Sequence, residues 1–132
     1  MAEINKFAAL KTYWSYFGLP AYEDSTVPEL VPDGKGGLIK LVPPYITFEV
    51  ATGSLDGVIP LSASVWYRGN SWAPVMEKVS SMEPFIDRQI KIEGGYLKVR
   101  RSITNFAQPM SDPSDDQIRR MRLNVEAEFL SY

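Results

Sequence analysis

The sequence contains no cysteine and no histidine. Without cysteine there is no disulfide, no thiolate metal site and no cysteine nucleophile. Without histidine the chain also lacks the commonest general base and the commonest zinc ligand. Catalysis would have to rest on carboxylates, lysine, tyrosine or serine. The two absences therefore predict a protein without catalytic residues, cofactor or metal.

The chain also has little net charge and no long apolar run. Fourteen lysines and arginines oppose 16 acidic residues, which leaves a net charge of −2. No global field therefore favours nucleic acid, and any DNA contact needs a local patch. No run approaches the roughly 18 apolar residues of a membrane span, and the charged N-terminal segment is not that of a signal peptide. We therefore expect synthesis in a cytoplasm and no membrane partner.

What the sequence does contain is the composition of an ordinary globule, with 45% hydrophobic and 23% charged residues. Its 132 residues predict one domain over 1–132. Between residues 63 and 79 the apolar spacing changes from every second residue to every third or fourth. That change indicates a strand that passes through Arg68-Gly69-Asn70 into a helix. The predicted fold class is α+β, a mainly antiparallel sheet with an N-terminal and a central helix packed on it.

Two helices follow from apolar stripes at helical spacing. The first is expected over about residues 3–17, with Gly18 as its C-cap, on the stripe Phe7, Leu10, Trp14 and Phe17. The second begins after Ser71, which can cap it, and ends at Pro84. Its predicted buried stripe consists of Trp72, Val75, Met76, Val79 and Met82.

Strands follow from alternation of apolar and polar residues. Residues 45–51 and 61–67 form a predicted antiparallel hairpin around a turn at 53–57. Residues 117–131 alternate throughout and predict one long strand whose outer face grades from basic to acidic. Strands are commonly about five or six residues long, so this length hints at contact with a neighbouring molecule.

A second hairpin is predicted over residues 88–101. We place Gly94-Gly95 at its two-residue turn, because adjacent glycines suit the positive φ angles of tight hairpin turns. That turn would pair Ile92 with Leu97 and Ile90 with Val99 on one face.

Two segments lack periodicity and are predicted to be loops. A flexible Pro/Gly-rich loop covers about residues 19–44, with at most a short strand at 38–42. Residues 33–37 lack the spacing of a phosphate-binding loop. An acidic loop covers about residues 107–116, within a wider irregular segment from 102 that includes a short extended piece at 106–110. Its aspartates do not follow a calcium-loop pattern, so solvated turns are expected.

The charged outer faces of the second hairpin and the last strand are the candidate interaction site. The basic residues can be read as one positive patch, and three interpretations stay open: an ordinary solvated face, a salt-bridge surface between subunits, or the lining of a channel for DNA. The candidate interface residues are Arg88, Lys91, Lys98, Arg100, Arg120, Arg122, Glu126 and Glu128.

Several stretches resemble small tail-terminator or head–tail joining proteins of long-tailed bacteriophages, which are often labelled minor capsid or tail completion proteins. The resemblance covers nearly the whole chain in the order of its elements. It rests on residues 44–47 (PYIT), on 65–68 (VWYR) with Ser71-Trp72, and on 124–130 (NVEAEFL). None of these stretches is a catalytic motif.

The resemblance implies a structural protein of the virion, made in the bacterial host cytoplasm and placed at the head–tail junction. It implies a homo-oligomeric, hexameric ring that closes the tail tube, joins it to the head connector and surrounds the passage for DNA. The implied partners are the tail tube protein and a connector or stopper protein. A monomer before docking is equally compatible with the resemblance.

Two alternatives to a tail terminator remain. One is another junction component, such as a connector stopper or head completion protein. The other is a small ligand-binding domain or enzyme that uses the sheet face, with the 19–44 loop as a lid.

Overall fold

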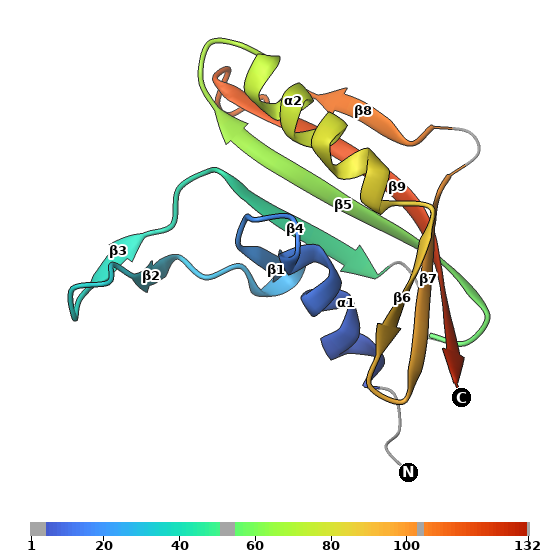
Figure 1. Ribbon diagram of the computed structural model, residues 1–132. Coiled ribbons are helices and arrows are strands. Elements are labelled where there is room, and N and C mark those ends of the chain that lie inside the picture. The colour runs from blue at the N-terminus through green and yellow to red at the C-terminus, as the bar shows by residue number, and fades with distance from the viewer. Residues whose placement is uncertain (1–4, 51–54, 103–104, 132) are drawn as a thin grey trace.

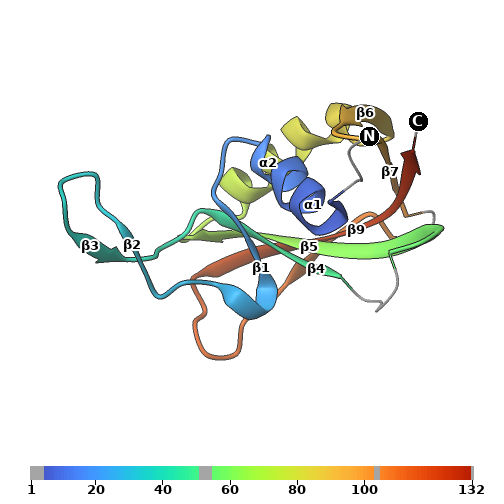
Figure 2. The same cartoon turned by 90° about the horizontal axis from the view of Figure 1, so that it is seen from below.

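In a computed structural model that describes residues 5–50, 55–102 and 105–131, the chain forms a seven-stranded sheet with two helices on one face (Figures 1 and 2). The strands in spatial order are β1 (Ala21–Glu23), β4 (Tyr45–Val50), β5 (Val58–Arg68), β9 (Ile118–Ser131), β7 (Gly95–Arg101) and β6 (Arg88–Ile92), and β8 (Ala107–Met110) also pairs with β9. Apart from the parallel β1–β4 pair, these pairings are antiparallel. The predicted α+β class is confirmed.

Strand β9 is the central element of the sheet. Its 14 residues pair with β5 on one side, and with β8 and then β7 on the other. Met121, Leu123, Val125 and Ala127 are buried on the helix side, and the residues between them lie on the opposite face. The prediction of one long strand at 117–131 is confirmed.

The helix α1 (Lys6–Ser15) is confirmed within the described residues; the predicted start at residue 3 lies outside them. The Asn5 side chain accepts a hydrogen bond from the Ala8 N–H at 3.1 Å, and Gly18 adopts φ +83° after the helix ends. Leu10, Tyr13 and Trp14 are buried, whereas Phe7 is 48% exposed. The buried stripe is therefore shorter than predicted.

The second helix, α2 (Ala73–Met82), covers β5 and β9. Ser71 Oγ accepts a hydrogen bond from the Ala73 N–H at 3.0 Å, and a short 3-10 helix, η2 (Glu83–Phe85), follows. Val75, Val79 and Met82 are buried as predicted. Met76 is 46% exposed, so its predicted place in the buried stripe is wrong.

The predicted register of the 88–101 hairpin is wrong by two residues, because the turn lies one residue earlier in the chain than predicted. Ile92 pairs with Gly95 and Ile90 with Leu97, so the turn is Glu93-Gly94. Gly94 has φ +85° and supplies the turn. Gly95 lies in β7, where a Cβ would come within 2.0 Å of the Leu130 carbonyl oxygen on β9. The second glycine is therefore needed for close approach of two strands, not for the turn.

The segment 19–44 contains more regular structure than predicted. Ala21 pairs with Ile46 in the parallel β1–β4 ladder, and a 3-10 turn, η1 (Asp24–Thr26), follows. Beyond it, β2 (Leu30–Pro32) and β3 (Leu38–Lys40) pair with each other in a separate two-stranded ribbon. The predicted short strand at 38–42 is thus present, but the prediction of a loop across the rest is wrong.

The acidic loop is shorter than its predicted range of 107–116. The predicted extended piece is the strand β8, which pairs along residues 120–123 of β9. The remaining loop connects β8 to β9 and lies on the face of the sheet opposite the helices (Figure 2).

Candidate interaction surfaces

A row of stacked side chains crosses the open face of the sheet, the face opposite the helices. The rings of Tyr45 and Trp66 stack with centroids 6.1 Å apart, and Tyr22 meets Tyr45 edge-on at 6.2 Å. The guanidinium of Arg120 lies 4.6 Å from the centroid of the Trp66 ring. Because one residue comes from each of β1, β4, β5 and β9, the row ties four strands together.

Small polar residues lie buried beneath this row. Thr47 and Ser64 are almost fully buried although α1 and α2 both lie on the other face of the sheet. Trp66 Nε1 donates to Thr47 Oγ1 at 2.8 Å, and Arg120 Nε donates to Ser64 Oγ at 2.9 Å. Burial, and the nearby Asp24 carboxylate, raise the pKa of Tyr45. Arg120 is therefore engaged within its own chain, as part of the sheet.

The candidate charges on β9 fall into two groups on the open face. Arg120 and Arg122 lie opposite Trp66 and Ser64 of β5, whereas Glu126 lies opposite Arg100 of β7. Arg120 and Glu126 are six residues apart, about 20 Å for the usual rise of a strand. The predicted grading of the outer face from basic to acidic is present along this strand.

The acidic end of β9 is neutralised by its neighbour. Arg100 Nε lies 2.8 Å from Glu126 Oε2, and Lys98 is directly opposite Glu128. Cross-strand pairs of this kind stabilise the sheet modestly when they are exposed. Lys98 and Arg100 therefore do not extend a positive patch around Arg120 and Arg122.

Arg88 lies on the helix side of the sheet, away from the other candidate residues. It pairs with the buried Val99, and its guanidinium lies 5.5 Å from the centroid of the Phe85 ring. Lys91 lies on the edge strand β6 and pairs with Tyr96 of β7. The interpretation as one positive patch is thus wrong: the cations lie in separate places on two faces.

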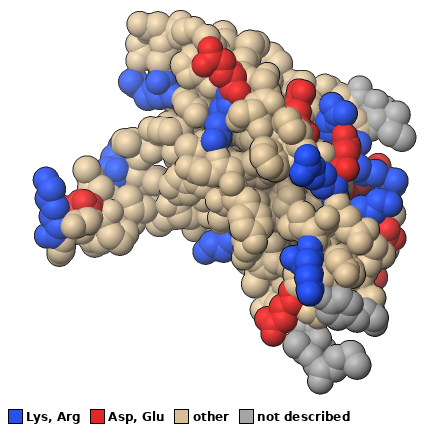
Figure 3. Space-filling view, viewed as in Figure 1, with Lys and Arg blue, Asp and Glu red and all other residues tan. Residues whose placement is uncertain are grey.

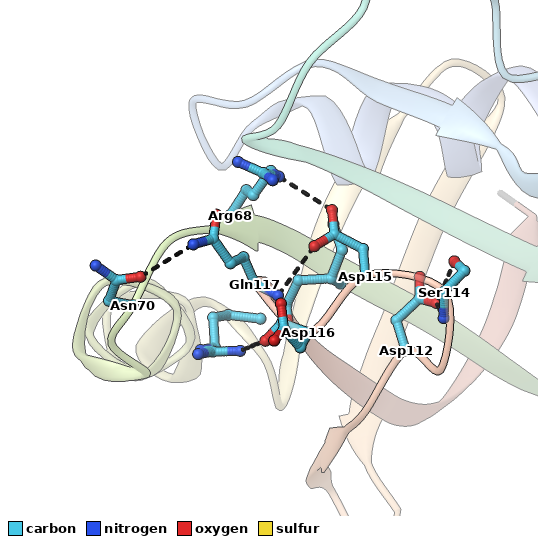
Figure 4. Close-up of polar contacts among 9 residues, drawn as sticks. Arg68, Asn70, Asp112, Ser114, Asp115, Asp116 and Gln117 are labelled. Atoms are coloured by element: carbon cyan, nitrogen blue, oxygen red, sulfur yellow. Dashed lines mark hydrogen bonds and ion pairs between the residues drawn. The ribbon is translucent and has the colours of Figure 1, made fainter.

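The Arg68-Gly69-Asn70 corner between β5 and α2 is tied to the acidic loop (Figure 4). Asp115 accepts from Arg68 Nε at 3.0 Å and from the Gln117 N–H at 3.0 Å, and Gln117 Nε2 donates to Asn70 Oδ1 at 3.2 Å. The Gln117 N–H, followed by the Arg68 side chain, holds the pKa of Asp115 below its usual range. Asp115 therefore fixes the turn before β9 and ties the acidic loop to this corner.

Asp112 has a similar local role and accepts from the Ser114 hydroxyl at 2.7 Å and the Ser114 N–H at 2.8 Å. These two bonds hold the pKa of Asp112 below its usual range. Among the described residues, no cluster of three or more acidic side chains is arranged to hold a metal ion.

A single acid, Asp87, joins the turn before β6 to the end of β7. It has φ +65°, and it accepts from the Arg101 N–H and from Arg101 Nε, each at 2.7 Å. The Arg101 N–H is the main cause that holds the pKa of Asp87 below its usual range. The carboxylate therefore fixes the position of β6 relative to β7.

Asp87→Asn is expected to reduce the loss of stability in acid. A carboxyl whose pKa is lower in the folded state stabilises the fold above its ordinary pKa of about 3.9, and that contribution is lost as the pH falls through the folded value. Because the Asp87–Arg101 ion pair is exposed, the substitution should change the free energy of unfolding by under about 1 kcal/mol. Thermal unfolding followed by circular dichroism across that pH range would measure it, and an unchanged pH profile in the variant would contradict the role of Asp87.

Strands β2 and β3 form an arm, residues 29–42, that projects from the body (Figures 1 and 2). The two strands pair only with each other within the described chain. Leu30, Leu38, Ile39 and Val42 are each between 54% and 65% exposed. Leu38 and Ile39 are consecutive in a strand, so both faces of the ribbon carry an exposed apolar side chain.

An apolar groove opens on the helix side, and we call it the helix–hairpin groove. It has a volume of about 580 Å³ and lies between the C-terminal ends of both helices and β6, with Tyr13, Phe17, Lys78, Phe85, Arg88 and Ile90 among its lining. A second hollow of about 490 Å³ shares Tyr16 and continues between α1 and residues 91–93. Figure 3 shows that the centre of this side carries few charged atoms.

The polar groups of the helix–hairpin groove are incompletely paired. The Tyr13 hydroxyl is buried and has no hydrogen-bond partner within the described residues, and burial, with the nearby Asp87, raises the pKa of Tyr13. Lys78 Nζ donates to the Phe17 carbonyl, and Arg88 stacks on Phe85. Neither cation takes part in the ion pairs found in the described part of the chain.

Sequence reasoning missed the groove as a candidate surface, and it placed the arm only within the 19–44 loop that a ligand-binding domain could use as a lid. The arm has a visible signal, the apolar residues of LIKLV at 38–42 inside a Pro/Gly-rich segment. The groove has none, because its walls come from three elements whose spacing depends on the packing of the whole core.

Comparisons with protein-family models, curated proteins and solved structures find no significant match to this chain. In the described ranges, no helix is both long enough and apolar enough to cross a membrane.

Proposed function

We propose that this protein is a structural subunit of the head–tail junction of a long-tailed bacteriophage, where it caps the tail tube as a ring and joins it to the head connector. The ring is homo-oligomeric and hexameric, and its partners are the tail tube protein and a connector or stopper protein. DNA passes through its lumen. The sequence resemblance to tail-terminator proteins is the source of this assignment.

The observation that carries the proposal is the arm, because it exposes large apolar side chains on both faces. Contiguous exposed apolar surface in a soluble protein commonly marks a site of protein association. A projecting ribbon without a partner in its own described chain fits a subunit that is completed by assembly. The open face of the sheet offers a second surface for a neighbouring subunit, and this surface is polar because it carries Arg122 and the cross-strand Arg100–Glu126 pair.

The test is capping of tail tubes. Purified protein is added to the tail tube protein of the phage that encodes it, and tube length and tube ends are followed by negative-stain electron microscopy. We expect rings at tube ends and an end to elongation. Particles that remain monomeric and never bind tubes would overturn the proposal.

Reversal of the charge at Arg122 is expected to weaken ring formation by more than about tenfold, since like charges at an interface cost several kcal/mol. Arg122 is a cleaner probe than Arg120, because Arg120 stacks on Trp66 and binds Ser64 within the chain. The measurement is the ring fraction of Arg122→Glu by native mass spectrometry on tube-bound and free protein. Lys11→Glu, on exposed α1 surface, is the matched control. Intact Arg122→Glu rings would remove the open face from the interface.

A second candidate is a ligand-binding domain, favoured by the volume and apolar lining of the helix–hairpin groove. Drug-sized ligands occupy pockets of about 300–1,000 Å³. Native mass spectrometry of the protein from its host would separate the candidates: a bound small molecule on a persistent monomer favours the second, and tube capping favours the first. A connector stopper would instead bind the head connector without capping tubes.

A further inference from the structure

The free edge of β6 runs beside the helix–hairpin groove. β6 is the last strand of the sheet order and pairs only with β7 among the described strands. Residues of β6 line the groove at Arg88 and Ile90, and residues 91–93 line its continuation toward α1. An unpaired strand edge next to an apolar groove can accept an added strand. Main-chain hydrogen bonds to the edge then supply affinity, and the groove receives the side chains of the added strand.

The arm has complementary properties. Its strands are three residues each, with a further bond from the Leu41 N–H to the Glu29 carbonyl at 2.9 Å, and β6 has five residues. The lengths therefore match within a short ladder. The exposed apolar side chains of the arm suit walls formed by Phe17, Phe85 and Ile90.

The unpaired polar groups of the groove also suit a peptide segment. A carbonyl of an inserted strand would supply the acceptor that the buried Tyr13 hydroxyl lacks within the described residues. Arg88 and Lys78 have no acid partner among the described ion pairs, and the arm carries the exposed carboxylates of Glu29 and Asp33. The arm also carries Lys35 and Lys40, so it has no net charge, and the complementarity consists of contacts between single carboxylates of the arm and these two cations of the groove.

We propose that the arm of one subunit docks into the helix–hairpin groove of a second copy of this chain and extends its sheet at β6. The inference rests on the proposed function, because it names the contact that closes the ring. The contact is heterologous: arm and groove are different surfaces of each subunit, and repetition of such a contact around an axis gives a ring. Each subunit then donates one arm and receives one.

Disulfide trapping tests this contact directly, because the chain has no natural cysteine. One protein carries Ile39→Cys in the arm, and a second carries Ser81→Cys at the lining of the groove. A third carries Ser111→Cys on the exposed loop between β8 and β9 and serves as the control. The mixtures are oxidised at high concentration and on tail tubes, then separated on non-reducing gels.

The expected result is a disulfide-linked dimer from the Ile39→Cys and Ser81→Cys mixture, and at least tenfold less from Ile39→Cys with Ser111→Cys. A chain carrying both Ile39→Cys and Ser81→Cys should give a ladder of linked species that ends at the ring size. Equal linking to the control position, or no arm–groove link in either condition, overturns the inference.

Complementation of two defective variants gives an independent readout. Leu38→Asp places a charge in the arm, and Phe85→Asp places one at the exposed rim of the groove. Both substitutions are at exposed positions, so the fold should be retained. Each variant alone is expected to lose rings, whereas an equimolar mixture should form heterodimers and nothing larger, since one intact arm and one intact groove remain. Rings in either variant alone would contradict the contact.

The two proposals fail in different ways. Rings that cap tubes without an arm–groove link leave the proposed function in place and remove this contact. An arm–groove link in a protein that never binds tubes supports the contact and removes the assignment to the tail.

Discussion

Gly95→Ala is expected to destabilise the fold by about 3 kcal/mol or more, because overpacking against backbone that cannot move costs at least as much as in a crowded core. The added Cβ would lie 2.0 Å from the Leu130 carbonyl oxygen and 2.9 Å from the Ser131 Cα. Both atoms belong to the backbone of β9, so the neighbour cannot rotate away. Relief requires β7 to separate from β9, which breaks the ladder between them. Urea unfolding monitored by tryptophan fluorescence measures the loss.

Substitutions at two other glycines serve as controls, because they measure how much stability is lost when a glycine is replaced without a steric clash. Gly94→Ala removes the positive φ residue of the turn and should cost about 1 kcal/mol. A Cβ at Gly69 would meet no described heavy atom within 4 Å beyond its chain neighbours, and its φ is not positive, so Gly69→Ala should be nearly neutral. A Gly95→Ala loss no greater than that of Gly94→Ala would show that the two strands are not held this closely.

Trp14→Ala is expected to cost about 3–5 kcal/mol, the range for removing a large aromatic residue from a core. Trp14 is fully buried, and its ring centroid lies 5.0 Å from that of Tyr13 and 5.9 Å from that of Phe17. Its removal leaves a cavity between α1 and the sheet, beside the helix–hairpin groove. Calorimetric unfolding of the two proteins measures the difference.

Trp14→Phe is the matched control, and it should lose much less stability than Trp14→Ala. The indole N–H of Trp14 is buried without a hydrogen-bond partner in the described structure, so phenylalanine removes an unsatisfied donor as well as some apolar area. Equal losses for both variants would indicate that the indole N–H is hydrogen-bonded in solution.

Sequence periodicity was sufficient where an element carries its own signal. The alternation over 117–131 predicted the long strand, and the stripe with Leu10 and Trp14 predicted α1. Periodicity also indicates the correct face for Arg88, because Arg88, Ile90 and Ile92 are alternate residues of one strand and share a face. Its charge nevertheless led us to group Arg88 with the cations of the open face.

The features that sequence could not predict depend on contacts between distant residues. β1 has three residues, and its position is set by pairing with Ile46, so its own propensity is uninformative. The turn register depended on Leu130, which excludes a side chain at Gly95 but lies far from it in the sequence. The helix–hairpin groove and the buried Thr47 and Ser64 likewise arise from tertiary packing.

The position of β9 in the chain has a consequence for synthesis. Its partners β5, β7 and β8 all precede it in the sequence, so on the ribosome the middle of the sheet stays open until residues 118–131 emerge. Long-range strand pairing is slow because distant segments must be brought together first. Until then the edges of β5 and β7 are unpaired and prone to aggregation, which makes release of this one strand the step that commits a nascent chain to its fold.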